Sequence, residues 1–144
     1  MEFIFLTSDM NDEEIQSHRK KCDCLMIDKK KLESNDSFIV TDEAFDITLQ
    51  PLRLVVIRLQ DLKNNNVVLN DRFRRNTMII ASDEDVRSSP EVTRFLENQG
   101  VALLMAKTSK EGLLDLQSLV KSLTSLRFKS IFIEDKIDLI QEFN

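Results

Sequence analysis

The sequence predicts a three-layer α/β fold, in which a mainly parallel sheet carries helices on both faces. Short runs rich in leucine and β-branched residues alternate with helical patterns from residue 24 to residue 143, as in chains of strand-helix units. The length of 144 residues suits a single domain over residues 1–144. No apolar run approaches the roughly 20 residues that a membrane-spanning helix needs, so no membrane contact is expected.

The most strongly patterned segment covers residues 112–143. Six apolar residues recur at three- and four-residue spacing and give a helix one apolar face. They are Leu113, Leu116, Leu119, Val120, Leu123 and Leu126. Residues 130–133 predict a short strand buried on both faces, and residues 135–143 resume a helical pattern. Ligands bind beyond the carboxyl ends of parallel strands, so the functional site is expected at residues 134–136.

The N-terminal part predicts a strand and a charged helix. Residues 2–6 fit a short strand or an extended lead-in, and residues 7–9 supply oxygens that can cap a following helix. The helix expected over residues 11–21 has Ile15 and Cys22 as its sparse apolar positions, so it should lie on the surface.

The middle of the chain adds further strands and one well-delimited helix. Proline at position 90 and glycine at position 100 delimit a helix over residues 90–99. The lysine-rich run at 28–31 is expected to be a solvated turn. Inner strands are expected at residues 24–27, 52–59, 77–81, 101–105 and 130–133.

Composition excludes several classes of function. Cys22 and Cys24 lack the second pair of ligands that a zinc site needs, and we expect no metal, with Cys24 in the core and Cys22 on the opposite side. A net charge of −5 argues against nucleic-acid binding. Two scattered glycines exclude a glycine-rich phosphate loop. The N-terminus lacks the basic start and long apolar core of a secretory signal, so a cytoplasmic location is expected.

Motifs follow one another in a recognisable order along the chain. Thr7 and Ser8 match an Ile-Thr-Ser segment, and residues 50–57, QPLRLVVI, match a QPIRIVID strand. A longer motif is matched without a gap at His18, Asp23, Leu25, Ile27, Leu32, Asn35 and Asp36, and later landmarks fall at 100–101, 115–116 and 130–134. Their order resembles that of the reductase domain of the riboflavin-biosynthesis deaminase-reductase. The resemblance implies a dihydrofolate-reductase-like fold that lacks the family's first and last strands.

The resemblance also implies an activity and a set of site residues. The family uses NADPH to reduce the ribose of a phosphoribosylaminouracil, so a phosphorylated pyrimidine is the implied substrate. Arg19 and Glu134 match the family's substrate-binding residues, whereas no catalytic residue is identified. The implied cofactor-binding positions are Thr7, Lys31, Asn35, Asp36, Asp135 and Lys136.

Substitutions at these positions predict weak cofactor binding. Asp135 and Lys136 replace a glycine pair whose amides approach the cofactor phosphates in the family, and Asp42 replaces a second substrate arginine. A carboxylate repels phosphate, and a side chain closes backbone conformations that favour glycine. Lys31 and Asn35 replace a threonine and an aspartate. We therefore expect slow or absent turnover.

The same residues also have structural interpretations. Arg19 lies at a lysine-rich helix end, where an exposed cation interacts favourably with the helix dipole, and Glu134 is placed to cap a following helix. His18 has no accompanying nucleophile and is expected on the surface. Lys31 meets a cofactor phosphate only if its loop folds over the sheet edge.

Functions of different classes therefore remain open. The first is an NADPH-dependent reductase of the riboflavin type, and the second is a non-catalytic scaffold for dimerisation or partner binding. A third is a generic nucleotide-binding α/β module, since fold alone does not decide function. Unpaired sheet edges invite pairing with another chain, so a homodimer or a heteromeric partner is expected.

Overall fold

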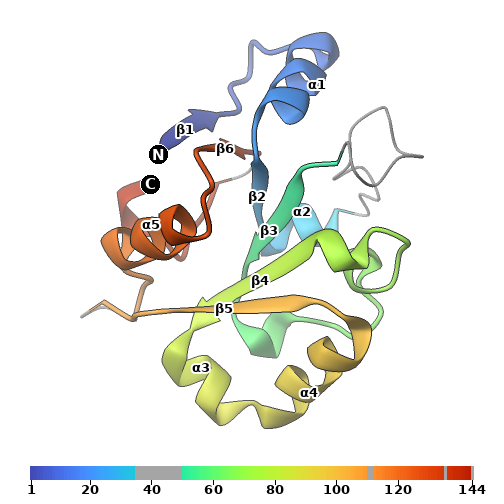
Figure 1. Ribbon diagram of the computed structural model, residues 1–144, viewed down its shortest axis with the longest axis vertical. Coiled ribbons are helices and arrows are strands. Elements are labelled where there is room, and N and C mark those ends of the chain that lie inside the picture. The colour runs from blue at the N-terminus through green and yellow to red at the C-terminus, as the bar shows by residue number, and fades with distance from the viewer. Residues whose placement is uncertain (35–49, 110–111, 135, 144) are drawn as a thin grey trace.

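Parallel strands dominate the structure, a computed structural model that describes residues 1–34, 50–109, 112–134 and 136–143. Within these residues six strands form a sheet of order β1-β6-β2-β3-β4-β5, and every adjacent pair is parallel (Figure 1). The strands are β1 (Glu2–Phe5), β2 (Cys24–Asp28), β3 (Leu52–Val56), β4 (Thr77–Ser82), β5 (Ala102–Ala106) and β6 (Ser130–Ile133). The prediction of a parallel sheet is confirmed.

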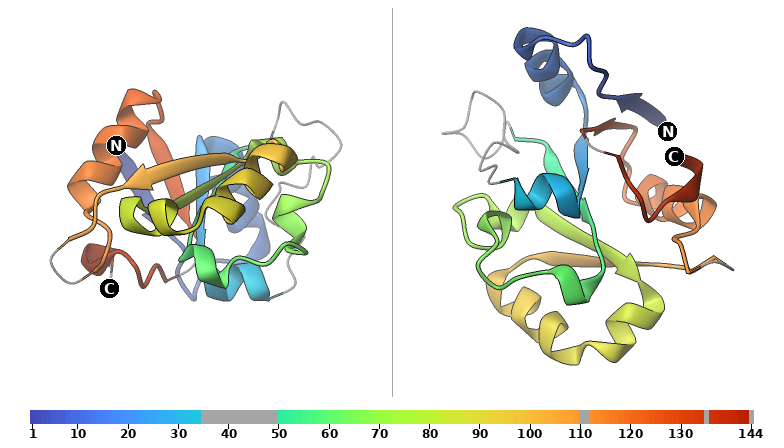
Figure 2. Two further views of the ribbon diagram at one scale, coloured as in Figure 1. Left: turned by 90° about the horizontal axis from the view of Figure 1, so that it is seen from below. Right: turned by 180° about the vertical axis from the view of Figure 1, so that it is seen from behind.

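Helices cover both faces of this sheet, which confirms the three layers. They are α1 (Asp12–Lys21), α2 (Lys29–Glu33), α3 (Asp83–Ser88), α4 (Pro90–Gln99) and α5 (Leu116–Ser125). Figures 1 and 2 show α3 and α4 beside β4 and β5, whereas α5 lies near the β1 and β6 end. None of the helices in the described ranges is long and apolar enough to cross a bilayer.

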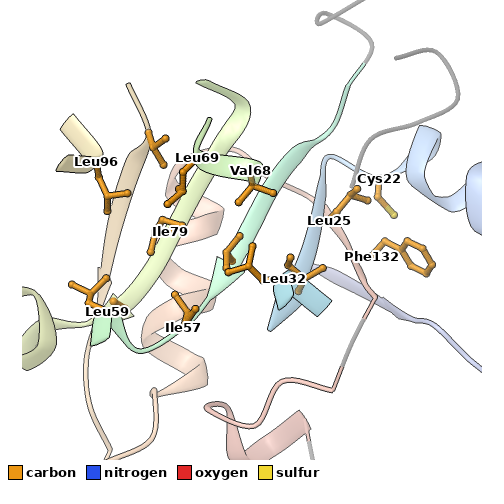
Figure 3. Close-up of a cluster of buried hydrophobic side chains, with 14 residues drawn as sticks. Cys22, Leu25, Leu32, Ile57, Leu59, Val68, Leu69, Ile79, Leu96 and Phe132 are labelled. Atoms are coloured by element: carbon orange, nitrogen blue, oxygen red, sulfur yellow. The ribbon is translucent and has the colours of Figure 1, made fainter. Parts of the chain in front are cut away.

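The hydrophobic core is divided in two by the sheet, because successive strand residues point to opposite faces. Leu25 and Ile27 of β2 belong to one cluster, in which Leu32 of α2 and Leu96 of α4 also lie (Figure 3). The second cluster contains Cys24 and Met26 together with Leu119 and Leu123 of α5. Because Cys22 lies in the first cluster, the prediction that the two cysteines occupy opposite sides is confirmed. Burial raises the pKa of Cys24 to about 12, so this thiol stays protonated.

Local capping explains several helix boundaries. The first turn of α1 is capped by Asn11, whose side chain accepts from the Glu14 N–H while Glu14 bonds back to the Asn11 N–H. The cap is thus Asn11, and the expectation of a cap at residues 7–9 is wrong. At α4, Pro90 occupies the first turn and Gly100 ends the helix with φ 72°, as predicted.

A buried arginine fixes the amino ends of β3 and β4. Arg53 is almost fully buried and donates to both carboxylate oxygens of Asp71 at 2.7 and 2.8 Å. It also donates to the Thr77 hydroxyl at 3.0 Å and to the Val68 carbonyl at 3.3 Å. Such a set satisfies the guanidinium inside the core, and it ties the connection between β3 and β4 to both strands.

Several elements differ from the sequence-based expectation in the first half of the chain. The strand expected over residues 52–59 ends at Val56, since the Leu59 N–H donates to the Asp85 carboxylate at 2.6 Å and a 3₁₀ turn follows. The expected turn at 28–31 is instead the helix α2, whose first N–H is capped by Asp28. Helix α3 was not expected, and β5 is an edge strand rather than an inner one.

The helix expected over residues 135–143 is also wrong. A single 3₁₀ turn, Gln141–Phe143, is present in its described part. The Asp138 N–H donates to the Asp28 carboxylate at 3.0 Å, and the Leu139 carbonyl accepts from Leu114 at 2.8 Å. These tertiary bonds use backbone groups that a helix needs for itself. The buried residues Ile137 and Ile140 produced the misleading three-residue period.

Substituting Ile131→Asp should unfold the domain. Ile131 has an exposed fraction of 0% and lies in the second cluster, and a buried unpaired charge costs several kcal/mol out of a total stability of about 5–15 kcal/mol. Thermal melting followed by circular dichroism measures the effect. The matched control is Leu126→Asp, because Leu126 is 45% exposed despite its position in the apolar heptad-like pattern. An unchanged melting temperature for Ile131→Asp would show that β6 is not central.

Candidate functional site

The residues predicted at the site gather where β1 and β6 end. A cavity of about 550 Å³ opens between the carboxyl ends of these two strands, which we call the β1–β6 cavity. It is lined by Phe5, Leu6, Thr7, Ser8, Met10, Ile15, Ile133, Glu134, Lys136 and Phe143. The cavity therefore lies beyond the carboxyl ends of the strands, where ligands of parallel α/β proteins bind. Three predicted site residues, Thr7, Glu134 and Lys136, line it.

A buried ion pair lies beside this cavity, and its acidic member, Glu134, belongs to the lining. Arg19 of α1 is only 6% exposed, and its Nε donates to the two carboxylate oxygens of Glu134 at 3.1 and 3.0 Å. A second guanidinium nitrogen, Nη2, also donates to Glu134 Oε1. The interpretation of Arg19 as an exposed cation is therefore wrong, and so is that of Glu134 as a helix cap. Their predicted role in substrate binding stays a prediction.

The position of the pair follows from the local structure of α1 and β6. Glu134 directly follows β6, its N–H donates to the Met26 carbonyl at 2.9 Å, and alternation along the strand points its side chain toward the face that α1 covers. The neighbouring His18 is half-buried, with its ring 5.2 Å from that of Phe132, rather than on the surface as expected. Bidentate geometry neutralises the Glu134 carboxylate, so this buried acid does not make the cavity negative.

The walls of the cavity are apolar on two sides and polar at the rim. Phe143 contacts Phe5 edge-to-face at a centroid distance of 5.4 Å, and Met10 and Ile15 add further apolar lining. Thr7 and Ser8 are exposed at the rim. The Thr7 hydroxyl donates to Asp9 and holds the pKa of that carboxyl below its usual range.

One further predicted position within the described residues, Lys31, is not brought to this cavity. Lys31 lies on α2 and lines neither the β1–β6 cavity nor its neighbours, so the structure does not place it with the other cofactor positions. Asn35, Asp36, Asp42 and Asp135 lie outside the described residues.

Two smaller cavities continue along the carboxyl edge of the sheet. One of about 270 Å³ lies at the ends of β2 and β3, and one of about 240 Å³ at the ends of β3, β4 and β5. Three carboxylates hold the backbone here: Asp28, Asp83 and Asp85, which we call the strand-end carboxylates. Sequence reasoning did not identify them. The available signal was their position, since each lies at or just after the end of a buried strand.

Comparison with known proteins supports the fold. The sequence matches no protein-family model and no curated protein. Its structure resembles the RibD protein of Acinetobacter baumannii (TM-score 0.61, 16% identity, 85% of this chain) and a pyrimidine reductase-like protein of Corynebacterium diphtheriae (0.64, 12%, 92%). It also resembles the riboflavin biosynthesis reductase Rib7 of Saccharomyces cerevisiae (0.62, 11%, 92%).

The chain has the fold of these pyrimidine reductases. At such low identity the likeness concerns the fold alone. The chain spans 31% of the length of RibD, 63% of the Corynebacterium protein and 60% of Rib7. In this chain the strand order places the β1–β6 cavity and the strand-end carboxylates along the carboxyl ends of one continuous sheet.

Removing one partner of the ion pair should destabilise the domain strongly. Arg19→Ala leaves Glu134 buried without its cation, which typically costs about 3–5 kcal/mol. The double variant Arg19→Met with Glu134→Leu removes both charges and should lose much less stability. Urea denaturation measures both, and Lys21→Ala, an exposed cation on the same helix, is the matched control. Equal losses in Arg19→Ala and Lys21→Ala would contradict a structural role for the pair.

Proposed function

We propose that this chain is a reductase-like domain that binds a small phosphorylated ligand in the β1–β6 cavity and performs NADPH-dependent reduction slowly or not at all. The ligand class is the phosphorylated pyrimidine that the resemblance implies. The observation that carries the proposal is that Glu134, neutralised by Arg19, lines a cavity whose lining also includes a cation and hydroxyl groups.

The charge of the cavity favours an anionic group. Arg19 cancels the charge of Glu134, and the described lining of the cavity also includes the basic residue Lys136. The Ser8 hydroxyl is a hydrogen-bond donor of the kind that phosphate oxygens use, whereas the Thr7 hydroxyl already donates to Asp9. The ammonium of Lys136 is a common phosphate-binding group.

The shape of the cavity suits a flat ring next to that phosphate. Phe5 and Phe143 present aromatic surface, and Met10 and Ile15 add apolar surface. Ligand sites in proteins commonly combine such apolar walls with a few convergent polar groups. A pyrimidine carrying a phosphorylated sugar has both features.

Slow or absent reduction follows from the groups that the site lacks for a cofactor. The glycine pair of the reductase family is replaced by Asp135 and Lys136, and a carboxylate near phosphate weakens binding. Glu134 accepts three hydrogen bonds from Arg19, so its carboxylate oxygens are already engaged by a cation of the protein itself.

Charge reversal at Lys136 tests the proposed ligand site. Calorimetric titration with uridine monophosphate should show binding to the wild-type chain, and Lys136→Glu should weaken it at least about tenfold, which corresponds to roughly 1.4 kcal/mol. Lys129→Glu is the matched control, because Lys129 is exposed and precedes the opposite end of the same strand. Uridine without phosphate should bind more weakly than the monophosphate.

The outcomes separate the alternatives. Equal losses in Lys136→Glu and Lys129→Glu would place the ligand elsewhere. Micromolar NADPH binding together with substrate-dependent oxidation of the cofactor would show an active reductase instead of a binding domain.

A scaffold role is the second candidate, and the sheet edges favour it. Among the residues that the structure describes, β1 and β5 each pair with one strand, and the exposed side chains Phe5 (45%) and Met105 (55%) lie on them. Unpaired edges with exposed apolar residues are sites at which another chain can add. We therefore keep the prediction of a homodimer or a heteromeric partner.

Sedimentation measures this assembly. The chain should sediment as a dimer at micromolar concentration, and Phe5→Lys should shift it toward the monomer because a charge is placed on the edge strand β1. Val67→Lys, at an exposed residue outside the sheet, is the control. A wild-type monomer across the concentration range would count against assembly with itself.

A further inference from the structure

The strand-end carboxylates occupy backbone donors along the carboxyl edge of the sheet. Asp28 is buried and accepts from the N–H groups of Lys29 and Asp138, the latter at 3.0 Å. Asp85 accepts from the Leu59 N–H at 2.6 Å. Backbone N–H groups at strand ends and helix starts are those that bind phosphates in nucleotide sites. Here the protein's own carboxylates take them.

The third strand-end carboxylate extends the same arrangement to β5. Asp83 accepts from the Glu84 N–H at 2.9 Å and from the Thr108 hydroxyl at 3.2 Å, and it pairs with Arg87 at 3.1 Å. The groups held by the three acids therefore follow four neighbouring strands, β2, β3, β4 and β5. Along the carboxyl ends of β2 to β5, these donor groups are thus bonded to carboxylates of the protein itself.

The charge along this part of the edge also opposes phosphate. The two cavities beside β2 to β5 are lined by six acidic residues and three basic ones. One of the basic residues, Lys29, forms ion pairs with Asp61 at 3.4 Å and Glu33 at 3.9 Å. An anionic ligand would therefore meet a surplus of negative charge.

The segment after β6 separates this region from the β1–β6 cavity. Lys136 lines the β1–β6 cavity, whereas Asp138 and Leu139 line the cavities beside β2 and β3. Between them Ile137 is fully buried in the core. The segment is held across the edge by the bond from Asp138 to Asp28 and by the bond from Leu114 to the Leu139 carbonyl.

We infer that the strand-end carboxylates take the place of ligand phosphates and close the edge from β2 to β5 to a dinucleotide. The residues present thus do not fit NADPH along this edge. Combined with the proposed function, on which this step rests, the ligand of the β1–β6 cavity is no larger than a mononucleotide.

Comparing a dinucleotide with its half tests the inference. Titration with NADPH and with reduced nicotinamide mononucleotide, followed by amide chemical shifts in a ¹⁵N-labelled chain, should show that NADPH gains no more than about threefold in affinity over the mononucleotide. The amides of Leu59, Glu84 and Asp138 should keep their shifts at saturating NADPH. A chain that does not bind NADPH at all would equally support the inference that the edge from β2 to β5 is closed to a dinucleotide.

A tighter dinucleotide would overturn the inference. If NADPH binds tenfold or more tightly than the mononucleotide and shifts the Leu59 or Asp138 amide, the edge is open. Asp85→Asn keeps an oxygen acceptor for Leu59 but removes the charge, so any NADPH affinity should rise in this variant and not in the control Glu97→Gln on the exposed side of α4. No rise in Asp85→Asn where NADPH is bound would contradict the repulsion.

Binding of uridine monophosphate tests the proposed function separately from the inference. If uridine monophosphate does not bind while NADPH leaves the β2–β5 amides unchanged, the proposed function fails and the edge is still closed. If uridine monophosphate binds and NADPH shifts those amides, the proposed function stands and the inference fails.

Discussion

The buried ion pair of Arg19 and Glu134 is the interaction on which the β1–β6 cavity depends. The two residues lie 115 positions apart in the sequence, and they join α1 to the end of β6. Removing two charges from water costs several kcal/mol per ion, and only bidentate geometry with additional hydrogen bonds offsets that cost. The pair therefore holds α1 at a fixed place over the strand, with Met10 and Ile15 forming one wall of the cavity. Few apolar residues of α1 are available to do this instead.

A second buried arginine joins separate segments at the other end of the strands, the amino ends. Arg53 collects Asp71, Thr77 and the Val68 carbonyl at the amino ends of β3 and β4. The amino edge is thus held by a cation with protein acceptors, and the carboxyl edge by carboxylates with protein donors. Among the described residues, no buried side-chain nitrogen or oxygen lacks a partner. In this sheet, the charged side chains named here, at the amino and at the carboxyl ends of the strands, hold parts of the protein together.

Much of the fold followed from the sequence, and the site followed in part. The strands were predictable because buried parallel strands are short apolar runs, and α4 because Pro90 and Gly100 act locally. The burial of Arg19 was not, since its neighbours His18, Lys20 and Lys21 are polar and its partner is remote in sequence. For the same reason the segment after β6 was mistaken for a helix. Its conformation is set by Asp28 and Leu114, which no local period can reveal.

The pairing of β1 with β6 has a consequence for how the domain folds. Phe3 pairs with Ile131 and Ile4 with Phe132, so this contact closes a loop that contains almost the whole chain. Contacts of such sequence separation carry a larger entropic cost of closure than the more local pairs β2 with β3, β3 with β4 and β4 with β5, so we expect them to form after those pairs. The cavity walls come from both partners of this last pair. A ligand that binds there binds the chain only when β1 is paired with β6, so it stabilises that pairing.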